Sequence, residues 1–285
     1  MDTTFEGMRR AGPLIVVTAV LFAGVGAGVL PAPSGAGQPR HRTTAAFPAG
    51  ARFDYQIGGA YRPAAGVEIV DRDRHAAPAA GRYNICYVNA FQAQPGQLGW
   101  WRREHRRLLL HDAAGHEVID RGWNEVLLDV GTPANRRALA GVIGRWIDGC
   151  AQRGFQAIEP DNLDSYTRSR GLLQASDAVA FAAKLTARAH EDGLRIAQKN
   201  AVELAGRRSR TGFDFAIAEE CQVYHECRGY TRRYGDAVIE IEYTDNGRRA
   251  FAAACAARGS RISIELVDRD VRAAGAAAHV RRWCG

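Results

Sequence analysis

The chain has 285 residues, of which 46% are hydrophobic and 24% are charged. This composition excludes a wholly disordered chain and allows one large domain or two small ones. The formal net charge of +7 comes almost entirely from arginine, because Lys184 and Lys199 are the only lysines. The arginines are scattered in ones and twos without interleaved aromatic residues, so we expect a solvated basic surface and no nucleic-acid partner.

The N-terminus predicts export. Two arginines precede an apolar run at residues 14–30, and small residues follow it. We expect a signal peptide at residues 1–36, a linker without a core at residues 37–50, and one folded domain at residues 51–285. A retained N-terminal anchor is the alternative. After removal of the signal, we expect a secreted monomer without membrane contact.

The six cysteines fit the oxidising compartment that an export signal implies. Cys221 and Cys227 are close enough to close a small loop, and Cys255 could tie down Cys284 near the C-terminus. Other pairings are possible, so these two disulfides are hypotheses. The sequence has no paired C-x-x-C motifs, and we expect neither a metal site nor a cofactor.

Short β-favouring runs recur along the chain, at residues 53–57, 67–70, 83–89, 155–159, 195–199, 213–218, 237–243 and 261–267. Helical patterns lie between the later runs, at residues 134–153, 176–192 and 248–258. Gly154, Gly193 and Gly259 each stand just before a strand, where a left-handed helix cap is expected.

This alternation predicts an α/β fold with a parallel sheet, and eight strands predict a (β/α)8 TIM-like barrel. A doubly wound open sheet is the competing architecture. The first half is irregular, because only residues 58–66 join the first two strands, too few for a crossover helix. Residues 100–130 contain a possible hairpin, and we interpret them as a small insertion after the third strand.

The predicted strands end in acidic residues, and in a barrel the carboxyl ends of the strands form the active site. Glycoside hydrolysis needs this kind of site, because one carboxyl group must carry a proton while a second stays ionised. Composition and spacing alone allow either a glycosidase or a metal-dependent hydrolase. For the latter, the candidate ligands are Asp71, Asp73, Asp161 and His190, which have no compact spacing.

Several segments resemble glycoside hydrolase family 114, the endo-α-1,4-polygalactosaminidases. The segments are FDYQIGG at 53–59, ICYVN at 85–89, GFQAIEPDNLDSY at 154–166, AH at 189–190, QKN at 198–200, EEC at 219–221, YHEC at 224–227 and EY at 242–243. The likeness extends from about residue 50 to the C-terminus. The EPDN motif followed by the EEC segment is specific because both occur in order.

The resemblance implies a catalytic pair of carboxylates on the fourth and sixth strands. Asp161 is the expected nucleophile. Glu219 and Glu220 compete for the role of acid/base. Successive side chains of a strand point to opposite faces, so a shift of one residue decides which of the two faces the site. If Phe213, Phe215 and Ile217 pack outward, their parity favours Glu220, whereas the family pattern favours Glu219, which we adopt.

Lys199 is expected to lie near the barrel mouth and to keep Asp161 ionised. Other residues are expected to bind sugar hydroxyls or amines, namely Asp54, Asp164, Asn200, Glu220, Glu242 and Tyr243. Glu159 is expected deeper in the barrel, as a supporting group. Trp100, Trp101 and Trp123 could stack on sugar, although aromatic residues of an insertion often form its own core.

The resemblance implies a galactosamine-containing α-1,4 polymer as substrate, cleaved internally by a two-carboxylate mechanism. We expect retention of configuration if the two carboxyl groups lie roughly 5–5.5 Å apart, whereas roughly 6.5–9.5 Å would indicate inversion. The free amines of such a polymer are cationic and would be attracted to an acidic barrel mouth. The net positive charge of the chain does not exclude this, because attraction depends on the electrostatic field at the site. A non-catalytic carbohydrate-binding barrel and a surface interaction protein are the alternatives from other classes.

Overall fold

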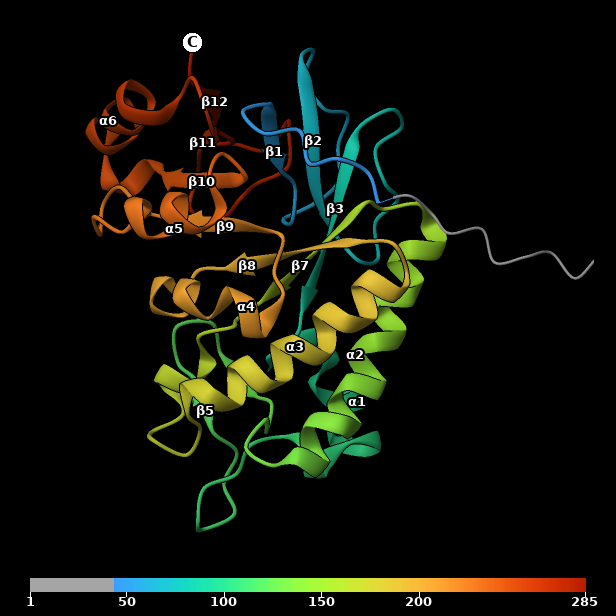
Figure 1. The fold of residues 1–285 in the computed structure, drawn as a ribbon. Helices are drawn as coiled ribbons and strands as arrows, with labels where there is room; N and C mark the ends of the chain where they lie inside the picture. The colour runs from blue at the N-terminus through green and yellow to red at the C-terminus, as the bar shows by residue number, and fades with distance from the viewer. Residues whose placement is uncertain (1–43) are drawn as a thin grey trace, which may run out of the picture. The chain divides into compact units, whose positions relative to one another are not determined.

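The computed structural model describes residues 44–285, so the predicted signal peptide and most of the predicted linker lie outside the described residues. The main sheet has the strand order β1-β2-β3-β7-β8-β9-β10-β11-β12 (Figure 1). Its strands are Arg52–Tyr55 (β1), Val67–Asp73 (β2), Tyr83–Asn89 (β3), Ala157–Asp161 (β7), Arg195–Lys199 (β8), Phe215–Glu219 (β9), Val238–Tyr243 (β10), Ser263–Val267 (β11) and Arg281–Trp283 (β12). The first eight are parallel and confirm the eight predicted runs, whereas β12 is antiparallel to β11.

Side chains close the barrel where β1 meets β11. The backbone N–H of Tyr55 donates to Oε2 of Glu265 at 3.0 Å, and Arg281 donates to the Tyr55 carbonyl at 2.7 Å. The indole of Trp283 donates to the carbonyl of Phe53. These contacts bring the first and last parallel strands together, so the fold is a nearly closed TIM-like barrel, and the open-sheet alternative is wrong.

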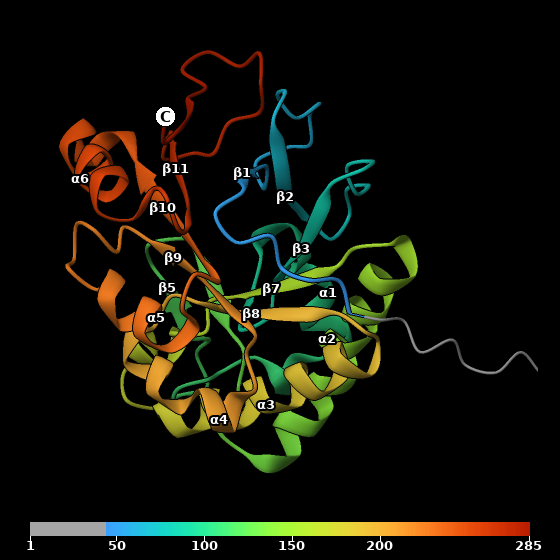
Figure 2. The same cartoon turned by 45° about the horizontal axis from the view of Figure 1, so that its top comes forward.

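Helices cover the outer face of the second half of the barrel. They are Pro95–Glu104 (α1), Pro133–Arg153 (α2), Ala175–Glu191 (α3), Arg208–Thr211 (α4), Cys227–Tyr234 (α5) and Arg248–Arg258 (α6). Single 3-10 turns lie at Arg106–Leu108, Ser165–Arg168, Val202–Arg207 and Thr244–Asn246. Figure 2 shows α2 and α3 side by side across the sheet. No helix joins β1 to β2 or β2 to β3, which confirms the irregular first half.

Two of the three predicted glycine caps are left-handed. Gly154 ends α2 with a φ of 94°, and Gly193 has a φ of 73°. The prediction for Gly259 was wrong, because its φ of −59° is right-handed. A Cβ at Gly259 would stand 2.7 Å from the carbonyl oxygen of Cys255 and 2.9 Å from the sulfur of Cys284, so close packing against the backbone and the disulfide requires glycine there.

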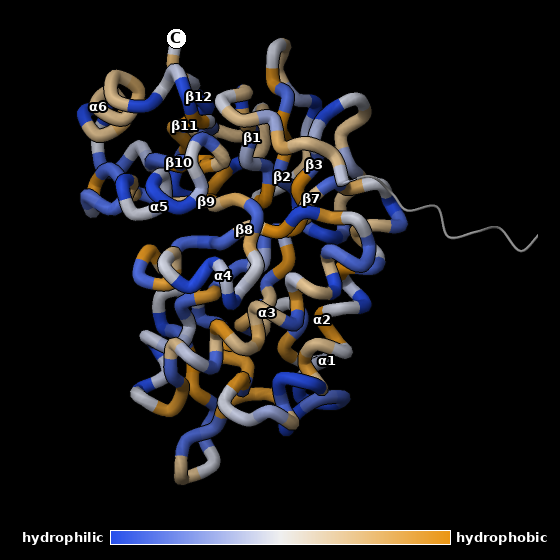
Figure 3. Tube along the Cα trace, in the orientation of Figure 1, coloured by the Kyte–Doolittle hydropathy of each residue, from blue (hydrophilic) through white to orange (hydrophobic). Residues whose placement is uncertain are grey.

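The insertion after β3 folds as a small antiparallel sheet in the order β4-β6-β5, with strands Gln92–Ala93 (β4), Ile119–Asp120 (β5) and Glu125–Leu127 (β6). Trp101 is buried and packs edge-on against Trp100 and Trp146. These tryptophans therefore form a core, whereas Trp123 at the end of the insertion remains 65% exposed. Figure 3 shows the apolar stretches concentrated along the strands and the helices packed on them.

Three disulfides hold the described residues together. Cys221 pairs with Cys227 and Cys255 with Cys284, which confirms both hypotheses, and Cys86 pairs with Cys150 between β3 and α2. Within residues 44–285, no helix is long and apolar enough to cross a bilayer.

The predicted linker ends earlier than expected. Phe47 stacks on Phe215 with a centroid distance of 4.7 Å and meets Tyr83 edge-on at 5.8 Å. The carbonyl of Ala45 also accepts a hydrogen bond from Arg195 at 2.8 Å. Burial of an aromatic ring against the inner barrel cluster holds this segment, so the expectation of no core there was wrong at Phe47.

Candidate active site

The side chains of β9 alternate between the inside of the barrel and the surrounding helices. Phe215 and Ile217 of β9 pack in the inner cluster with Phe53, Ile239 and Ile241, while Ala216 and Ala218 face the helices. Side chains alternate along a strand, so Glu219 points inward as well. Phe215 and Ile217 thus pack inward, not outward, and Glu219 shares their parity.

A buried ammonium group joins the ends of three strands. Nζ of Lys199, at the end of β8, lies 2.6 Å from Oε1 of Glu159, 3.1 Å from Oδ1 of Asp161 and 3.4 Å from Oε2 of Glu219. It also donates to the hydroxyl of Tyr55 at 3.1 Å. Lys199 is only 2% exposed, and Glu159 is fully buried below it. The expected contact between Lys199 and Asp161 is therefore present.

Asp161 is held as a carboxylate. Burial opposes its ionisation, but the Lys199 ammonium, the hydroxyl of Tyr87 and the backbone N–H of Asn162 together lower its pKa. The Tyr87 hydroxyl donates to Oδ2 of Asp161 at 2.8 Å. Burial opposes the charge of Lys199 too, yet Asp161, Glu159 and then Glu219 raise its pKa well above its usual range. The pair is thus ionised together.

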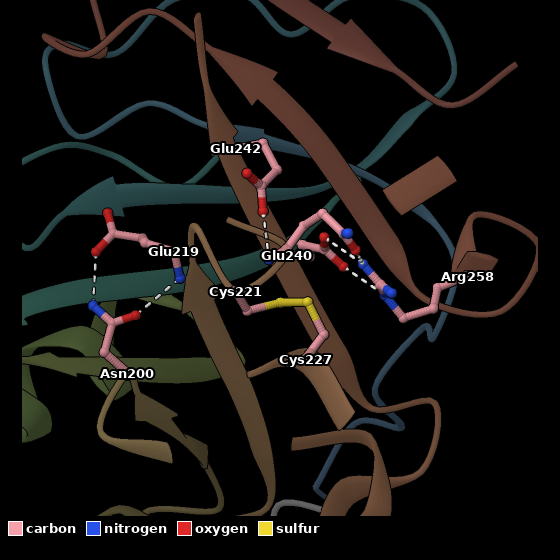
Figure 4. The surroundings of a disulfide bond; sticks show 8 residues. Asn200, Glu219, Cys221, Cys227, Glu240, Glu242 and Arg258 are labelled. Carbon is pink, nitrogen blue, oxygen red and sulfur yellow. Dashed lines mark hydrogen bonds and ion pairs between the residues drawn. A yellow bond between two sulfur atoms is a disulfide. The ribbon is translucent and has the colours of Figure 1, made fainter. Parts of the chain in front are cut away.

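Glu219 is held by a second set of donors (Figure 4). Nδ2 of Asn200 donates to its Oε2 at 2.8 Å, and the hydroxyl of Tyr243 donates to its Oε1 at 2.5 Å. The backbone N–H of Glu219 in turn donates to Oδ1 of Asn200 at 2.9 Å. Both carboxylate oxygens are therefore fixed in direction.

The chain turns sharply after each of these strands. Asn162, Asn200 and Glu220 follow β7, β8 and β9, and all three have left-handed backbone angles, with φ of 65°, 48° and 57°. Asparagine tolerates this conformation better than most residues, whereas for glutamate it is uncommon. Such angles cluster where the surrounding structure fixes the position of functional groups.

The carboxylates open into a cavity of about 400 Å³. Its wall includes Tyr55, Tyr87, Trp123, Glu125, Asp161, Asp164, Arg168, Lys199, Asn200, Glu219, Tyr243 and Arg269. An adjoining cavity of about 380 Å³ shares Trp123, Asp164, Asn200, Glu219, Tyr243 and Arg269 and adds Glu203, Glu220, Tyr224 and Glu226. Because six residues line both, the two cavities lie side by side at the barrel mouth, and together they are called the groove.

Five residues predicted at the site line this groove together with the pair, namely Asp164, Lys199, Asn200, Glu220 and Tyr243. Asp164 is paired with Arg168 at 2.8 Å, and Glu220 with Arg269 at 2.6 Å.

Two predicted sugar-binding residues face away from the groove. Asp54 alternates with inward Phe53 and Tyr55, so it points outward and accepts hydrogen bonds from Gln56 and Tyr61. Glu242 likewise alternates with inward Ile241 and Tyr243, and it accepts from the backbone N–H of Gln222 at 3.0 Å. Both predictions were wrong. Side chains alternate along a strand, so a residue between two inward-facing side chains must point outward.

Four other groove residues were not predicted from the sequence. Two of them, Tyr55 and Tyr87, could have been found, because they alternate with outward-facing residues along β1 and β3. Glu125 lies on β6 of the insertion, where burial raises its pKa to about 7 although Asn89 donates to it. Arg269 stacks over the ring of Tyr243 at 3.9 Å, but it is one of many arginines. Nothing in the sequence distinguished these last two.

The structure does not assemble the metal-ligand set considered from the sequence. His190 lies on α3 and pairs with Asp214 at 2.9 Å, apart from the groove. Among the described residues, the only close group of metal-ligating side chains is Cys221, Cys227 and Glu240. Its two sulfur atoms form a disulfide, and Glu240 is bonded to Arg258, as Figure 4 shows.

Comparisons with known proteins agree with this geometry. The structure of Aspergillus fumigatus Ega3 in complex with galactosamine matches with a TM-score of 0.67 and 22% identity, covering 86% of this chain and 100% of that chain. The glycoside hydrolase domain of PelA from Pseudomonas aeruginosa matches with a TM-score of 0.53 and 16% identity, covering 79% and 97%. Comparison with curated protein sequences gives no match. The model of glycoside-hydrolase family GH114 matches residues 35–285, so the chain belongs to that family.

Proposed function

We propose that this protein is a secreted endo-acting hydrolase of α-1,4-linked, galactosamine-containing polysaccharide, with Asp161 as nucleophile and Glu219 as acid/base. The observation that carries the proposal is the pair of carboxylates on β7 and β9 that both contact the ammonium of Lys199. Galactosamine bound to the structural relative Ega3 supports the substrate class. The disulfides and the apolar run at residues 14–30 support secretion.

In the first step, the Asp161 carboxylate attacks the anomeric carbon while Glu219 donates a proton to the leaving glycosidic oxygen. Asp161 suits attack because Lys199, Tyr87 and the backbone of Asn162 favour its ionised form over its protonated form. The new bond joins Oδ of Asp161 to the sugar, and the bond to the leaving sugar breaks.

In the second step, Glu219 accepts a proton from water, which then displaces Asp161 from the sugar. Esterified Asp161 carries no charge, so the ammonium of Lys199 then interacts with Glu219 and Glu159 alone. Lys199 thus supports both steps without transferring a proton itself.

The spacing of the carboxylates supports retention of configuration. Nζ of Lys199 lies 3.1 Å from Oδ1 of Asp161 and 3.4 Å from Oε2 of Glu219. These two oxygens can therefore be at most about 6.5 Å apart, the lower end of the roughly 6.5–9.5 Å range of inverting enzymes. Retaining enzymes have separations of roughly 5–5.5 Å, which this geometry allows.

The groove also suits a cationic polymer cleaved within the chain. Its two cavities lie side by side and share six lining residues, which is consistent with binding of more than one sugar unit. Carboxylates from the insertion and from the loops after β7, β8 and β9 line it, namely Glu125, Asp164, Glu203, Glu220 and Glu226. Free amines on the polymer would meet opposite charge along this wall even though the whole chain is basic.

Replacing Glu219 with glutamine should reduce kcat on the polymer by about 10²- to 10⁴-fold, because the leaving oxygen loses its proton donor. A galactosaminide with a dinitrophenyl leaving group needs no such donor, so its first step should be much less affected. Added azide should replace water in the second step and give a glycosyl azide of retained configuration. Steady-state rates and product analysis measure both effects.

Glu220→Gln is the matched control, because Glu220 is the next residue and is already bonded to Arg269 and Asn246. It should change kcat by less than about tenfold. If Glu220→Gln shows the large loss and the azide product instead, the acid/base assignment is wrong.

Replacing Trp123 with alanine should raise KM for the polymer by about tenfold, because its ring is exposed at the wall that both cavities share. The value of kcat should change little. Leu172→Ala removes another exposed apolar side chain, outside the groove, and should leave KM unchanged. Equal effects of both substitutions on KM would exclude a stacking role for Trp123.

The direct test of the proposal is incubation of the full chain with partially deacetylated α-1,4-galactosaminogalactan, with product lengths read by mass spectrometry. Internal cleavage gives a ladder of oligosaccharides from the start of the reaction. Binding of the polymer without any product would support the carbohydrate-binding barrel instead. Activity lost in the presence of a chelator would support the metal-dependent hydrolase.

A further inference from the structure

A second carboxyl group, that of Asp71, lies below Lys199 and takes no part in the proposed mechanism. Asp71 is on β2, points into the barrel and is fully buried. In the part of the chain that the structure describes, no donor reaches either of its side-chain oxygens or Oε2 of Glu159. A hydrogen bond with Glu159 is among the causes that raise the pKa of Asp71, so the two carboxyl groups are neighbours. Two carboxylates offer each other only lone pairs, so a proton on one of them would pair these otherwise unpaired oxygens.

The surroundings decide which of the two groups holds this proton. Oε1 of Glu159 accepts hydrogen bonds from Lys199 at 2.6 Å and from the hydroxyl of Tyr55 at 2.9 Å, so Glu159 already has an ion-pair partner. Among the described residues, no such donor contacts Asp71. Burial first, and then the charge and hydrogen bond of Glu159, raise the pKa of Asp71 well above its usual range.

The other groups around Asp71 agree with a neutral acid. The titratable side chains that face it are Tyr55 on β1, Tyr87 on β3, Glu159 and Asp161 on β7, and Lys199 on β8. Among these, Lys199 is the single cation, and it already contacts both Glu159 and Asp161. A negative charge on Asp71, in addition to those on Glu159 and Asp161, would have no cation as partner. Burying an unpaired charge costs free energy of folding.

We propose that Asp71 is a positioning residue, a neutral carboxylic acid that donates to Glu159 and so keeps Lys199 between Asp161 and Glu219. The inference rests on the proposed function only in assigning catalysis to Asp161 and Glu219. Without a donor at Asp71, Oε2 of Glu159 would be buried and unpaired. The Glu159 carboxyl would then turn both oxygens toward Lys199 and draw the ammonium away from Asp161.

Stability as a function of pH tests the protonation state without any need for turnover. In the unfolded chain Asp71 ionises near its ordinary pKa of 3.8, whereas in the folded chain it keeps its proton. Unfolding therefore releases a proton above pH 4, and the parent loses stability as the pH rises. Asp71→Asn keeps the shape and the donor but cannot ionise. The equilibrium constant for folding of Asp71→Asn, relative to that of the parent, should therefore grow by up to about tenfold per pH unit above pH 4.

Asp268→Asn is the matched control, because Asp268 is also a buried aspartate. Burial opposes its ionisation, but the backbone N–H groups of Arg272 and Val280 and the charge of Arg281 outweigh burial and lower its pKa. Its variant should therefore be less stable than the parent by an amount that stays constant above about pH 4. Melting temperatures from pH 4 to pH 8 should show a growing advantage of Asp71→Asn and a constant deficit of Asp268→Asn. If the difference between Asp71→Asn and the parent is also independent of pH over this range, Asp71 is ionised and the proposal is overturned.

Activity tests the positioning role. Asp71→Leu, which has no donor, should lower kcat by about 100-fold with KM nearly unchanged, whereas Asp71→Asn should stay within about fivefold of the parent. Equal losses of kcat in both variants would overturn the role of the donor. If the leucine variant fails to fold, the asparagine variant still decides the matter through its kcat and its pH trend. A parent without any hydrolytic activity would instead refute the proposed function, and the stability result would stand.

Discussion

Replacing Asp161 with asparagine should lower kcat by about 10⁴-fold or more, the largest loss of activity that we expect from any single substitution at this site. The amide has the shape of the carboxylate but cannot attack the anomeric carbon, so the covalent step is lost. Tyr87 and Lys199 lose their bonds to a carboxylate, yet Lys199 keeps Glu159 as a partner at 2.6 Å. We therefore expect a folded protein that still binds the polymer.

Three measurements check this expectation. Polymer hydrolysis gives kcat, equilibrium binding of the polymer gives affinity, and thermal unfolding reports the fold. Asp164→Asn is the control, because Asp164 lies three residues further on, at the groove wall, and is already paired with Arg168. It should affect KM by a few fold and kcat very little. Comparable losses of kcat in the two variants would rule out a special role for Asp161.

The barrel was predictable from the sequence because each parallel strand is a short apolar run between helices or turns. The end of β9 was harder, because Glu219 and Glu220 are adjacent and the direction of Phe215 and Ile217 was unknown. Once these two side chains are seen to pack inside the barrel, parity directs Glu219 into the barrel as well. The same reasoning would have removed Asp54 and Glu242 from the predicted site.

Other features could not be predicted because they depend on contacts between distant residues. The barrel closes through a bond from the Tyr55 backbone to Glu265, which is 210 residues further along the chain. Glu125 reaches the groove only through the fold of the insertion, and Phe47 is partly buried because its ring packs against the inner barrel cluster. Local sequence patterns carry no information about such pairings.

Replacing Lys199 with methionine should cost both stability and turnover, because within residues 44–285 it removes the one cation that contacts Glu159, Asp161 and Glu219 together. Removing one partner of a buried ion pair typically costs about 3–5 kcal/mol. For a domain of this size, we expect the melting temperature to fall by roughly 10 °C. We also expect kcat to fall by at least about 100-fold, because Asp161 loses its main counter-charge.

The pH dependence of this loss follows from two pKa shifts of opposite direction. The lowered pKa of Asp161 gives stability that is present above the ordinary value of 3.8 and disappears as the pH falls through the folded value. The raised pKa of Lys199 gives stability that is present below the ordinary value of 10.5 and disappears as the pH rises through the folded value. The gap in melting temperature between parent and variant should therefore be widest between these two ordinary values.

Lys184→Met provides the matched control, since Lys184 is the only other lysine and lies exposed on α3. It should leave both the melting temperature and kcat unchanged. Glu159→Gln in the Lys199→Met background should recover part of the lost stability, because one buried charge no longer lacks a partner. If the double variant is as unstable as the sum of the two single variants predicts, the two side chains are not coupled and the ammonium does not hold the carboxylates in place.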